Sequence, residues 1–249
     1  MICDQDKRVV GTQPPGAAGE EAAATAVREM FSAIAPRYDL LNHVLSINVD
    51  RLWWRRAARA FRHILERPGA RVLDLCCGTC DMGLAILNES ADARVVGADF
   101  AHPMLRIARR KTAGKRFALV ESDALRLPVK DESFDLVVSA FGFRNLANYG
   151  AGLHEILRVL RPGGEVGILD FGNPKGVLGA LYGFYFRRVL PKIGAIISGV
   201  RGPYAYLPAS VERFPEPSEM AARMRDAGFR EAGWSPYTFG IAGLYRGQK

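Results

Sequence analysis

The stretch VLDLCCGTCD, residues 72–81, decides the fold of this chain. Apolar residues surround Asp74 in a run that is typical of a buried strand, and the run ends before Gly78. A helical pattern, LAIL, begins at Leu84, so Gly78 lies in a tight turn between a strand and a helix. Such a turn lets a ligand approach the bare Cα and the backbone N–H groups closely. The stretch therefore predicts a ligand-binding turn.

A second acidic residue supports this interpretation. Asp99 follows the apolar run VVGA and lies 25 residues after Asp74. An acid at the tip of the second strand of a βαβ unit is placed to accept hydrogen bonds from ribose hydroxyls. Asp74, Gly78 and Asp99 together predict a site for a cofactor that contains a nucleoside.

The composition of the turn narrows the choice of cofactor. It has one glycine and no lysine, so it matches neither the GxGxxG dinucleotide fingerprint nor the GxxxxGK[ST] phosphate loop. A ligand with adenine and ribose but no phosphate fits better, which favours S-adenosylmethionine. The alternative is an ordinary turn of a parallel sheet with a solvated aspartate.

The rest of the chain alternates strands and helices. Strands are predicted at 71–75, 94–98, 117–121, 134–140 and 165–171, separated by helices at 81–89, 102–112 and 150–160. Helices at 27–35 and 49–65 precede them, and a helix at 218–227 with strands at 229–235 and 238–245 follows. This order predicts an α/β fold with a seven-stranded, mostly parallel sheet, whose ligands bind at the carboxyl ends of the strands.

Residues after the third and fourth predicted strands resemble those of class I methyltransferases. The resemblance lies in ESDA at 121–124, in SFD at 133–135 and in RPGG at 161–164. It implies a Rossmann-like fold in which Asp123 and Ala124 contact the adenine ring. The full predicted cofactor set is Asp74, Gly78, Thr79, Asp99, Asp123, Ala124 and Ala140.

Three further blocks resemble a narrower family, the UbiE/MenG C-methyltransferases of quinone biosynthesis. These blocks are residues 30–56, FGFRN at 141–145 and residues 184–215, and the resemblance runs from about residue 27 to the end. It implies that S-adenosylmethionine methylates a prenylated demethylmenaquinol to menaquinol. The CCGT form of the turn is more similar to the menaquinone branch than to the ubiquinone branch. The alternative substrate is the 2-polyprenyl-6-methoxy-1,4-benzoquinol of ubiquinone biosynthesis.

Methylation of a quinol carbon needs a base, often a positioned water, and a donor that stabilises the phenolate. Arg144 and Asn145, just past the fourth strand, are the candidate catalytic residues. A guanidinium cannot act as a base at neutral pH, so Arg144 is expected to stabilise the phenolate and to orient a water with Asn145. The alternative is a structural ion pair of Arg144 with a carboxylate at a helix end. Tyr38, Asn42, Phe141 and Tyr182 are the predicted substrate contacts.

Residues 176–213 interrupt the alternation. Residues 177–186 are apolar almost all round and are flanked by Lys175 on one side and by Arg187 and Arg188 on the other. Such a helix belongs either to the core or to a lipid-facing cover. The expected insertion is therefore a helical substrate cover that contacts an anionic membrane surface.

The net charge of +8 arises largely from clusters of arginine and lysine, a feature of proteins that bind anionic membranes or nucleic acid. An RNA-directed methyltransferase or a nucleic-acid-binding protein is thus a further alternative, but no aromatic–basic recognition motif is present, so no nucleic acid is expected. The CxxC motif at Cys77 and Cys80 has no second pair, so no metal site is predicted. A reduced pair is favoured over a redox pair.

Residues 1–26 are rich in alanine, glycine and proline and are predicted to form a flexible tail before a methyltransferase domain at 27–249. No secretory signal and no apolar span of 18 residues is visible. A cytoplasmic protein with peripheral membrane association is expected, and a homo-oligomer remains open.

Overall fold

Seven strands form one sheet in the computed structural model of the protein, which describes residues 10–46, 48–185, 188 and 202–249. The strands are β1 Arg71–Leu75, β2 Arg94–Asp99, β3 Phe117–Glu121, β4 Phe134–Ala140, β5 Leu160–Phe171, β6 Arg230–Tyr237 and β7 Ala242–Gln248. Their order across the sheet is β3-β2-β1-β4-β5-β7-β6. Only β7 runs antiparallel to its neighbours, so the predicted seven-stranded, mostly parallel sheet is confirmed.

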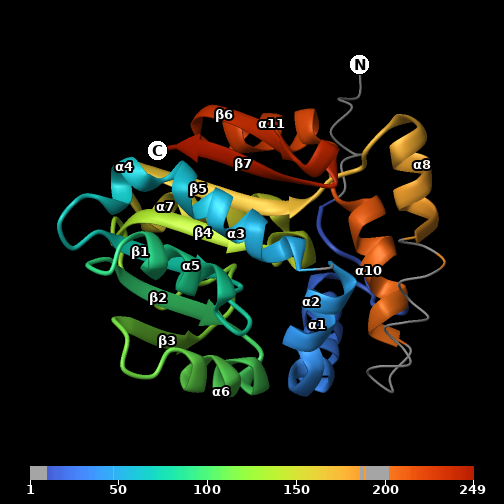
Figure 1. Ribbon diagram of the computed structural model, residues 1–249, viewed down its shortest axis with the longest axis horizontal. Coiled ribbons are helices and arrows are strands. Elements are labelled where there is room, and N and C mark those ends of the chain that lie inside the picture. The colour runs from blue at the N-terminus through green and yellow to red at the C-terminus, as the bar shows by residue number, and fades with distance from the viewer. Residues whose placement is uncertain (1–9, 47, 186–187, 189–201) are drawn as a thin grey trace.

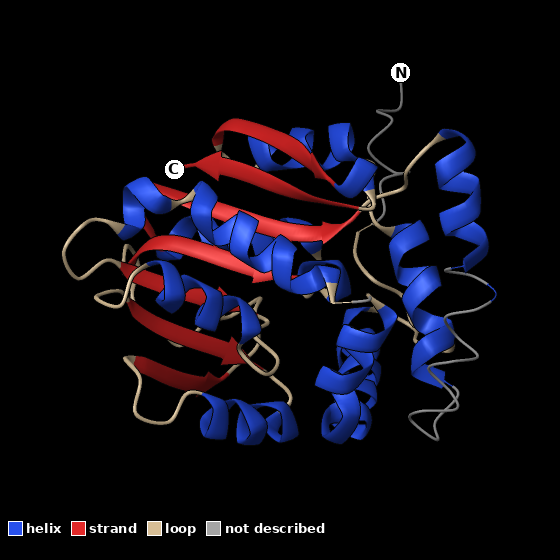
Figure 2. Ribbon diagram, in the orientation of Figure 1, coloured by secondary structure: helices blue, strands red, loops and turns tan. Residues whose placement is uncertain are grey.

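Helices cover both faces of this sheet (Figure 2). They are α1 Glu20–Ile34, α2 Tyr38–Leu45, α3 Val49–Ala60, α4 Arg62–Leu65, α5 Asp81–Glu89, α6 His102–Lys111, α7 Tyr149–Val159, α8 Gly176–Phe184, α10 Gly202–Arg213 and α11 Pro217–Asp226. Short 3-10 turns lie at η2 Ala35–Arg37, η3 Phe143–Asn145 and η5 Thr238–Gly240.

The central strands are rich in apolar residues because both of their faces are largely buried. Along β1, Val72 packs with Trp53 of α3 and Ile86 of α5 on one face. Leu73 joins the other face, with Ile156 of α7 in the same cluster. Alternate residues of one strand thus serve two cores, which fixes the register of the sheet between its helical layers.

The strands β1 to β5 all end on one edge of the sheet, here called the carboxyl edge. Figure 1 shows α1, α2, α8 and α10 beside this edge, on the right of the view. The turns after β1, β2 and β4 therefore face helices that come from both ends of the chain. The expected insertion at 176–213 is helical at α8 and α10, and residues 186–187 and 189–201 between them lie outside the described residues.

The predicted flexible tail at 1–26 is wrong where the structure describes it. Helix α1 begins at Glu20, and Thr12 is buried, with its backbone N–H donating to Leu146 O at 2.8 Å. Residues 1–9 lie outside the described residues. The segment at 10–19 has no periodic pattern because backbone hydrogen bonds to a loop, and not an amphipathic face, hold it in place.

Other predicted boundaries also differ: β5 begins at Leu160 and not at residue 165, and two further deviations change the elements themselves. The single helix expected at 49–65 breaks at Phe61, whose φ of −110° lies outside the helical range, into α3 and α4. The last strand begins at Ala242 and not at Thr238, because η5 intervenes with a φ of +46° at Thr238 and +58° at Phe239. Neither deviation is visible in the pattern of apolar residues.

Candidate active site

A cavity of about 720 Å³ opens at the carboxyl edge. Its walls come from the turns after β1, β2, β3 and β4 and from α1, and Tyr38 of α2 also lines it. The elements that alternate along the sequence thus converge on one pocket, as the parallel topology requires.

The turn after β1 forms one wall of this cavity. Gly78 has a φ of +52°, and Cys76 and Cys80 also adopt left-handed conformations, with φ of +53° and +72°. Glycine adopts this conformation without strain, whereas the two cysteines are held in it at a cost in local energy. Strain of this kind concentrates at binding sites.

Asp99 lies directly beside this turn. Its Oδ2 accepts a hydrogen bond from Gly78 N at 2.8 Å, and its Oδ1 accepts one from Ala101 N at 2.9 Å. Burial raises the pKa of the Asp99 carboxyl, and these N–H groups partly oppose that shift. The structure therefore brings Gly78 and Asp99 together in the cavity wall, as the sequence predicts.

Three more of the predicted cofactor residues, Asp123, Ala124 and Ala140, also line the cavity. Asp123 is exposed and uses Oδ1 to accept from Leu125 N at 2.9 Å. Next to it, Ser122 Oγ is buried and has no hydrogen-bond partner within the described part of the chain. Acidic oxygens and an unpaired hydroxyl beside apolar walls suit a ligand with a polar sugar and a flat base.

Asp74 and Thr79, which were predicted to contact the cofactor, do not line the cavity. Asp74 is 1% exposed and accepts a hydrogen bond from Gly83 N at 2.8 Å, so it joins β1 to α5. Burial raises the pKa of the Asp74 carboxyl well above its ordinary value. Thr79 is also 1% exposed and donates its hydroxyl proton to Asp39. Both side chains are thus engaged in contacts between elements, and neither is among the residues that line the cavity.

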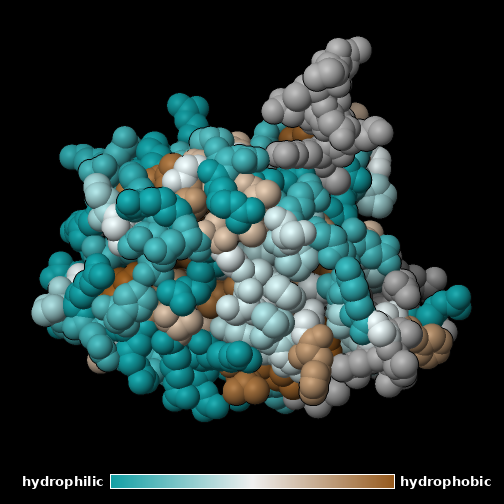
Figure 3. All heavy atoms as spheres, turned by 90° about the horizontal axis from the view of Figure 1, so that it is seen from above, coloured by the Kyte–Doolittle hydropathy of each residue, from teal (hydrophilic) through white to brown (hydrophobic). Residues whose placement is uncertain are grey.

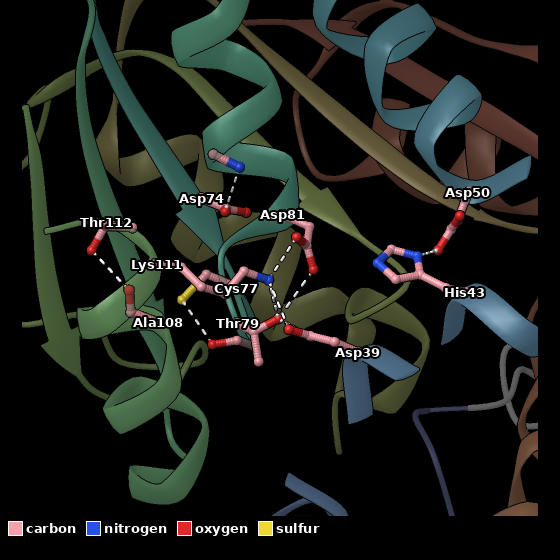
Figure 4. A network of polar contacts seen from close by, with 12 residues as sticks. Asp39, His43, Asp50, Asp74, Cys77, Thr79, Asp81, Ala108, Lys111 and Thr112 are labelled. Atoms are coloured by element: carbon pink, nitrogen blue, oxygen red, sulfur yellow. Dashed lines mark hydrogen bonds and ion pairs between the residues drawn. The ribbon is translucent and has the colours of Figure 1, made fainter. Parts of the chain in front are cut away.

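An ion-pair network that sequence analysis missed lies behind this turn. Lys111 Nζ donates to Asp81 Oδ1 at 2.7 Å, to Asp39 Oδ2 at 3.0 Å and to Thr79 Oγ1 at 3.1 Å (Figure 4). It connects α6, α5 and α2. Since Tyr38 precedes Asp39, the network holds Tyr38 in the cavity wall. No sequence spacing signals a contact between residues so far apart.

Arg144, the first candidate catalytic residue, is 5% exposed and is not among the residues that line the cavity. Its Nη1 lies 2.9 Å from Asp170 Oδ1, and its backbone N–H donates to the other carboxylate oxygen at 3.2 Å. Nη1 also donates to the Phe141 carbonyl, and the guanidinium lies over the Phe171 ring. Arg144 thus forms a structural ion pair, with a carboxylate at the end of β5 and not at a helix end, and its direct catalytic role stays a prediction.

Asn145, the second candidate catalytic residue, does line the cavity. Its Nδ2 donates to Phe141 O at 3.3 Å, and its Oδ1 accepts from the hydroxyl of Tyr206 at 3.0 Å. The η3 turn thus directs two neighbouring side chains to different surroundings. Arg144 is buried behind the wall, and Asn145 reaches its surface.

Of the four residues predicted to contact the substrate, two line the cavity and two are not among its lining residues. Tyr38 and Phe141 line the cavity, and Phe141 packs on Phe171 with ring centroids 4.6 Å apart. Tyr182 instead packs in a small apolar cluster with Val211 of α10, away from the lining. Asn42 lies in α2, and its side chain lies outside the described residues.

Helix α1 contributes a wall that the sequence did not predict. Ala24, Val27 and Phe31 all line the cavity, and the first of these falls within the expected tail. The available signal was the apolar face formed by Val27, Met30, Phe31 and Ile34, which are spaced as on one side of a helix. Such spacing does not show which part of the protein the apolar face covers. The structure shows that this face closes the pocket.

The CxxC cysteines are free thiols, both buried. Burial raises the pKa of the Cys77 thiol well above its ordinary value, and a hydrogen bond with Cys80 adds to the shift. Such a thiol is a poor nucleophile and a poor redox partner, which supports the reduced pair. Within the part of the chain that the structure describes, no group of three His, Cys, Asp or Glu side chains is arranged to hold a metal ion.

Solved structures with the same architecture include methyltransferases. A SAM-dependent methyltransferase from Thermotoga maritima, a possible histamine N-methyltransferase, superposes with a TM-score of 0.63 at 19% identity, covering 89% of this chain and 99% of that one. The [4+2]-cyclase SpnF superposes with a TM-score of 0.65 at 15% identity, covering 98% and 99%. At such identities the likeness defines the fold class alone, the Rossmann-like fold of class I methyltransferases.

Sequence similarity goes further than the fold. The model of the ubiE/COQ5 methyltransferase family matches residues 19–249, and the chain belongs to that family. The demethylmenaquinone methyltransferase of Deinococcus radiodurans is 50% identical over 227 residues, which cover 90% of this chain and 92% of the relative. That of Thermus thermophilus is 49% identical, covering 88% and 100%.

Proposed function

We propose that the protein is a C-methyltransferase that transfers a methyl group from S-adenosylmethionine to a ring carbon of a prenylated demethylmenaquinol, forming menaquinol. The observation that carries this proposal is the cavity in which Gly78 and Asp99 are joined by a hydrogen bond and which Asn145 and Phe141 also line. Membership of the ubiE/COQ5 family and the names of the two relatives support the same reaction.

The residues present fit the cofactor. Asp99 would accept hydrogen bonds from the ribose hydroxyls, and Ser122 Oγ, which is unpaired, would gain a partner from the bound nucleoside. Asp123 and Ala124 would lie against the adenine. When bound, S-adenosylmethionine supplies an electrophilic methyl group.

The chain's own residues have to position the quinol and manage its proton. Asn145 cannot take a proton, but its amide can hold a water or a phenolate oxygen. Arg144 acts indirectly, since its hydrogen bond to the Phe141 carbonyl and its ion pair with Asp170 fix the backbone that carries Asn145. Phe141 offers an aromatic face to the quinol ring. The chemistry thus depends on orientation and exclusion of water.

The test is a methylation assay with the purified protein, S-adenosylmethionine and two reduced quinols with short side chains. One is a demethylmenaquinol, and the other is a 2-prenyl-6-methoxy-1,4-benzoquinol, which represents the ubiquinone alternative. Mass spectrometry of the product is expected to show one added CH₂ on the naphthoquinol ring. Methylation of the benzoquinol alone would assign the protein to the ubiquinone branch, and methylation of neither would refute the proposal.

Peripheral contact with an anionic membrane surface is part of this proposal, because a long prenyl tail does not leave the bilayer freely. Figure 3 shows a largely hydrophilic surface with separate hydrophobic patches. Among the side chains that the structure describes, the exposed large hydrophobic residues are Val10, Leu40, Leu52, Phe184 and Phe239. Phe184 of α8 and Phe239 of η5 both lie at the carboxyl edge, and exposed Lys175 and Arg188 flank α8. Aromatic side chains favour the level of the lipid headgroups, and basic side chains are attracted to anionic headgroups.

No helix within the described ranges is both long enough and apolar enough to cross a membrane. Arg187, which was predicted to contact the membrane together with Arg188, lies outside the described residues. The proposed contact therefore depends on Arg188, Lys175 and the exposed aromatic residues of α8 and η5.

A further inference from the structure

A series of buried hydrogen bonds links Asn145, through Tyr206, to Thr12 near the N-terminal end of the described residues. The Tyr206 hydroxyl lies 3.0 Å from Asn145 Oδ1 and 2.6 Å from Thr12 Oγ1. All three residues are more than nine-tenths buried. Because buried polar groups with complete partners have one favoured arrangement, this series of hydrogen bonds fixes the orientation of the Asn145 amide.

The direction of each bond follows from the chemistry of the groups. An amide oxygen only accepts, so Tyr206 donates its single proton to Asn145, and Thr12 must then donate its own proton to Tyr206. Rotating the amide would place its oxygen 3.3 Å from the Phe141 carbonyl oxygen, where two acceptors would repel each other. The Thr12 hydroxyl is thus the first donor in this series of hydrogen bonds.

Residues 10–13, here called the strap, lie against the loop that follows η3. Two backbone hydrogen bonds join them: Thr12 N donates to Leu146 O, and Tyr149 N donates to Val10 O, both at 2.8 Å. The strap therefore reaches the loop that follows the candidate catalytic turn.

Gly11 and Arg213 hold the strap in this position. A Cβ at Gly11 would lie 2.0 Å from Ala147 O, so the close approach of the two backbones requires glycine. Arg213 of α10 donates to Gly11 O at 3.2 Å and to Gln13 Oε1 at 2.7 Å. The family match begins at residue 19, so the strap lies outside it.

We propose that Thr12 and Tyr206 are positioning residues for methyl transfer and act through the amide of Asn145. This inference rests on the proposed function. With Oδ1 held by Tyr206 and one Nδ2 proton held by the Phe141 carbonyl, the second Nδ2 proton is left for the cavity that Asn145 lines. Without Thr12, Tyr206 loses its donor and the amide loses its fixed orientation.

The test compares Thr12→Val, Thr12→Ser, Tyr206→Phe and the Thr12→Val/Tyr206→Phe pair in the full-length protein. Thr12→Val keeps the shape and removes the hydroxyl, so kcat is expected to fall about fivefold to tenfold while the KM for S-adenosylmethionine is unchanged. Thr12→Ser is expected to retain kcat. The double variant is expected to be no slower than Tyr206→Phe, because Thr12 acts only through the tyrosine hydroxyl.

Thr112→Val is the matched control. Thr112 is equally buried, but its hydroxyl donates to Ala108 O within α6, away from the cavity. This variant is expected to keep kcat even if its thermal midpoint falls as far as that of Thr12→Val. Equal losses of kcat in both variants would reduce the role of Thr12 to general stability and overturn the proposal.

A second readout does not depend on methyl transfer. The side-chain amide signal of Asn145 in a ¹⁵N spectrum, assigned by its loss in Asn145→Ala, is expected to shift in Thr12→Val and to return in Thr12→Ser. An unchanged signal together with an unchanged kcat would refute the proposal. If the signal shifts but the wild-type protein methylates no quinol, the link from Thr12 to Asn145 stands and the proposed function fails.

Discussion

Lys111 and Asp39, 72 residues apart in sequence, form an ion pair of 3.0 Å that fastens α2 to α6 behind the cofactor turn. Lys111 also pairs with Asp81 at 2.7 Å. Although burial lowers the pKa of Lys111, the two carboxylates outweigh this effect and raise it above its ordinary value. The raised pKa favours the charged ammonium, which holds Asp39, and with it Tyr38, against α6.

Lys111→Met is expected to loosen Tyr38 and to weaken cofactor binding severalfold, with roughly 1 kcal/mol lost from the free energy of unfolding, because the site is only partly buried. Calorimetric titration with S-adenosylmethionine measures the first effect, and urea unfolding measures the second. Lys115→Met removes an exposed lysine four residues away and serves as the control. Equal affinity for S-adenosylmethionine in the two variants would show that the ion pairs of Lys111 do not shape the pocket.

Asp99→Asn is expected to weaken cofactor binding about tenfold or more, since hydrogen bonds to a charged acceptor are stronger than neutral ones. The amide oxygen can accept from only one of the two backbone N–H groups, Gly78 N and Ala101 N, that now donate to the carboxylate, so part of the loss is expected to come from the turn. Isothermal titration with S-adenosylhomocysteine is the measurement. Unchanged affinity would remove Asp99 from the ribose site.

Arg144→Met is expected to lower the free energy of unfolding by about 3 kcal/mol or more, because it leaves the fully buried carboxylate of Asp170 without a counter-charge. The double variant Arg144→Met/Asp170→Asn removes both charges and should regain much of that stability. Methyl transfer should stay low in the double variant, since the Phe141 carbonyl has still lost one of its two side-chain donors and keeps only Asn145 Nδ2. Full activity in the double variant would show that Arg144 has no part in positioning the loop.

The buried carboxyl of Asp74 predicts a pH dependence of stability. Its pKa in the folded protein is raised well above the ordinary value of 3.8 by burial, whereas the unfolded chain releases this proton near the ordinary value. Between these two pKa values the folded state binds more protons than the unfolded state. The contribution of Asp74 to the free energy of unfolding therefore falls as the pH rises. Asp99, whose pKa is also raised by burial, acts in the same direction.

Asp74→Asn removes this titration and keeps an acceptor for Gly83 N. Relative to wild type, the variant is expected to become more stable as the pH rises from mildly acid to neutral. Urea unfolding at a series of pH values measures the difference between the two proteins. A constant difference across the series would contradict the assignment.

Binding to anionic vesicles is expected to be reversible, to weaken with salt, and to weaken further in Phe239→Ser and in Arg188→Glu. Both side chains are exposed, and both variants should keep activity on a short-chain quinol. Arg230→Glu reverses a charge at the start of β6, at the opposite edge of the sheet, and is the control. Vesicle sedimentation that is absent at low salt, or equal in all variants, would refute the membrane contact.

Sequence reasoning located the core of the site because its signals are local. The switch from strand to helix around Gly78 and the acid at the tip of β2 are both visible within 30 residues, and parallel strands bring such turns to one edge in any arrangement of the helices. Periodicity does not report which way a side chain points from an irregular turn. For that reason Asp74, Thr79 and Arg144 were placed in the cavity, although the structure buries them behind its wall.

Patterns of neighbouring residues are enough to predict the α/β fold, the order of its elements up to β5 and the position of the Gly78 turn and of Asp99 at one edge of the sheet. Only the tertiary structure decided the contacts between distant residues. The bonds of Arg144 to Asp170, of Lys111 to Asp39 and of Thr12 to Tyr206 span 26, 72 and 194 residues. A buried donor needs an acceptor, and the packing of the helices determines which acceptor lies within reach. The sequence does not show this packing.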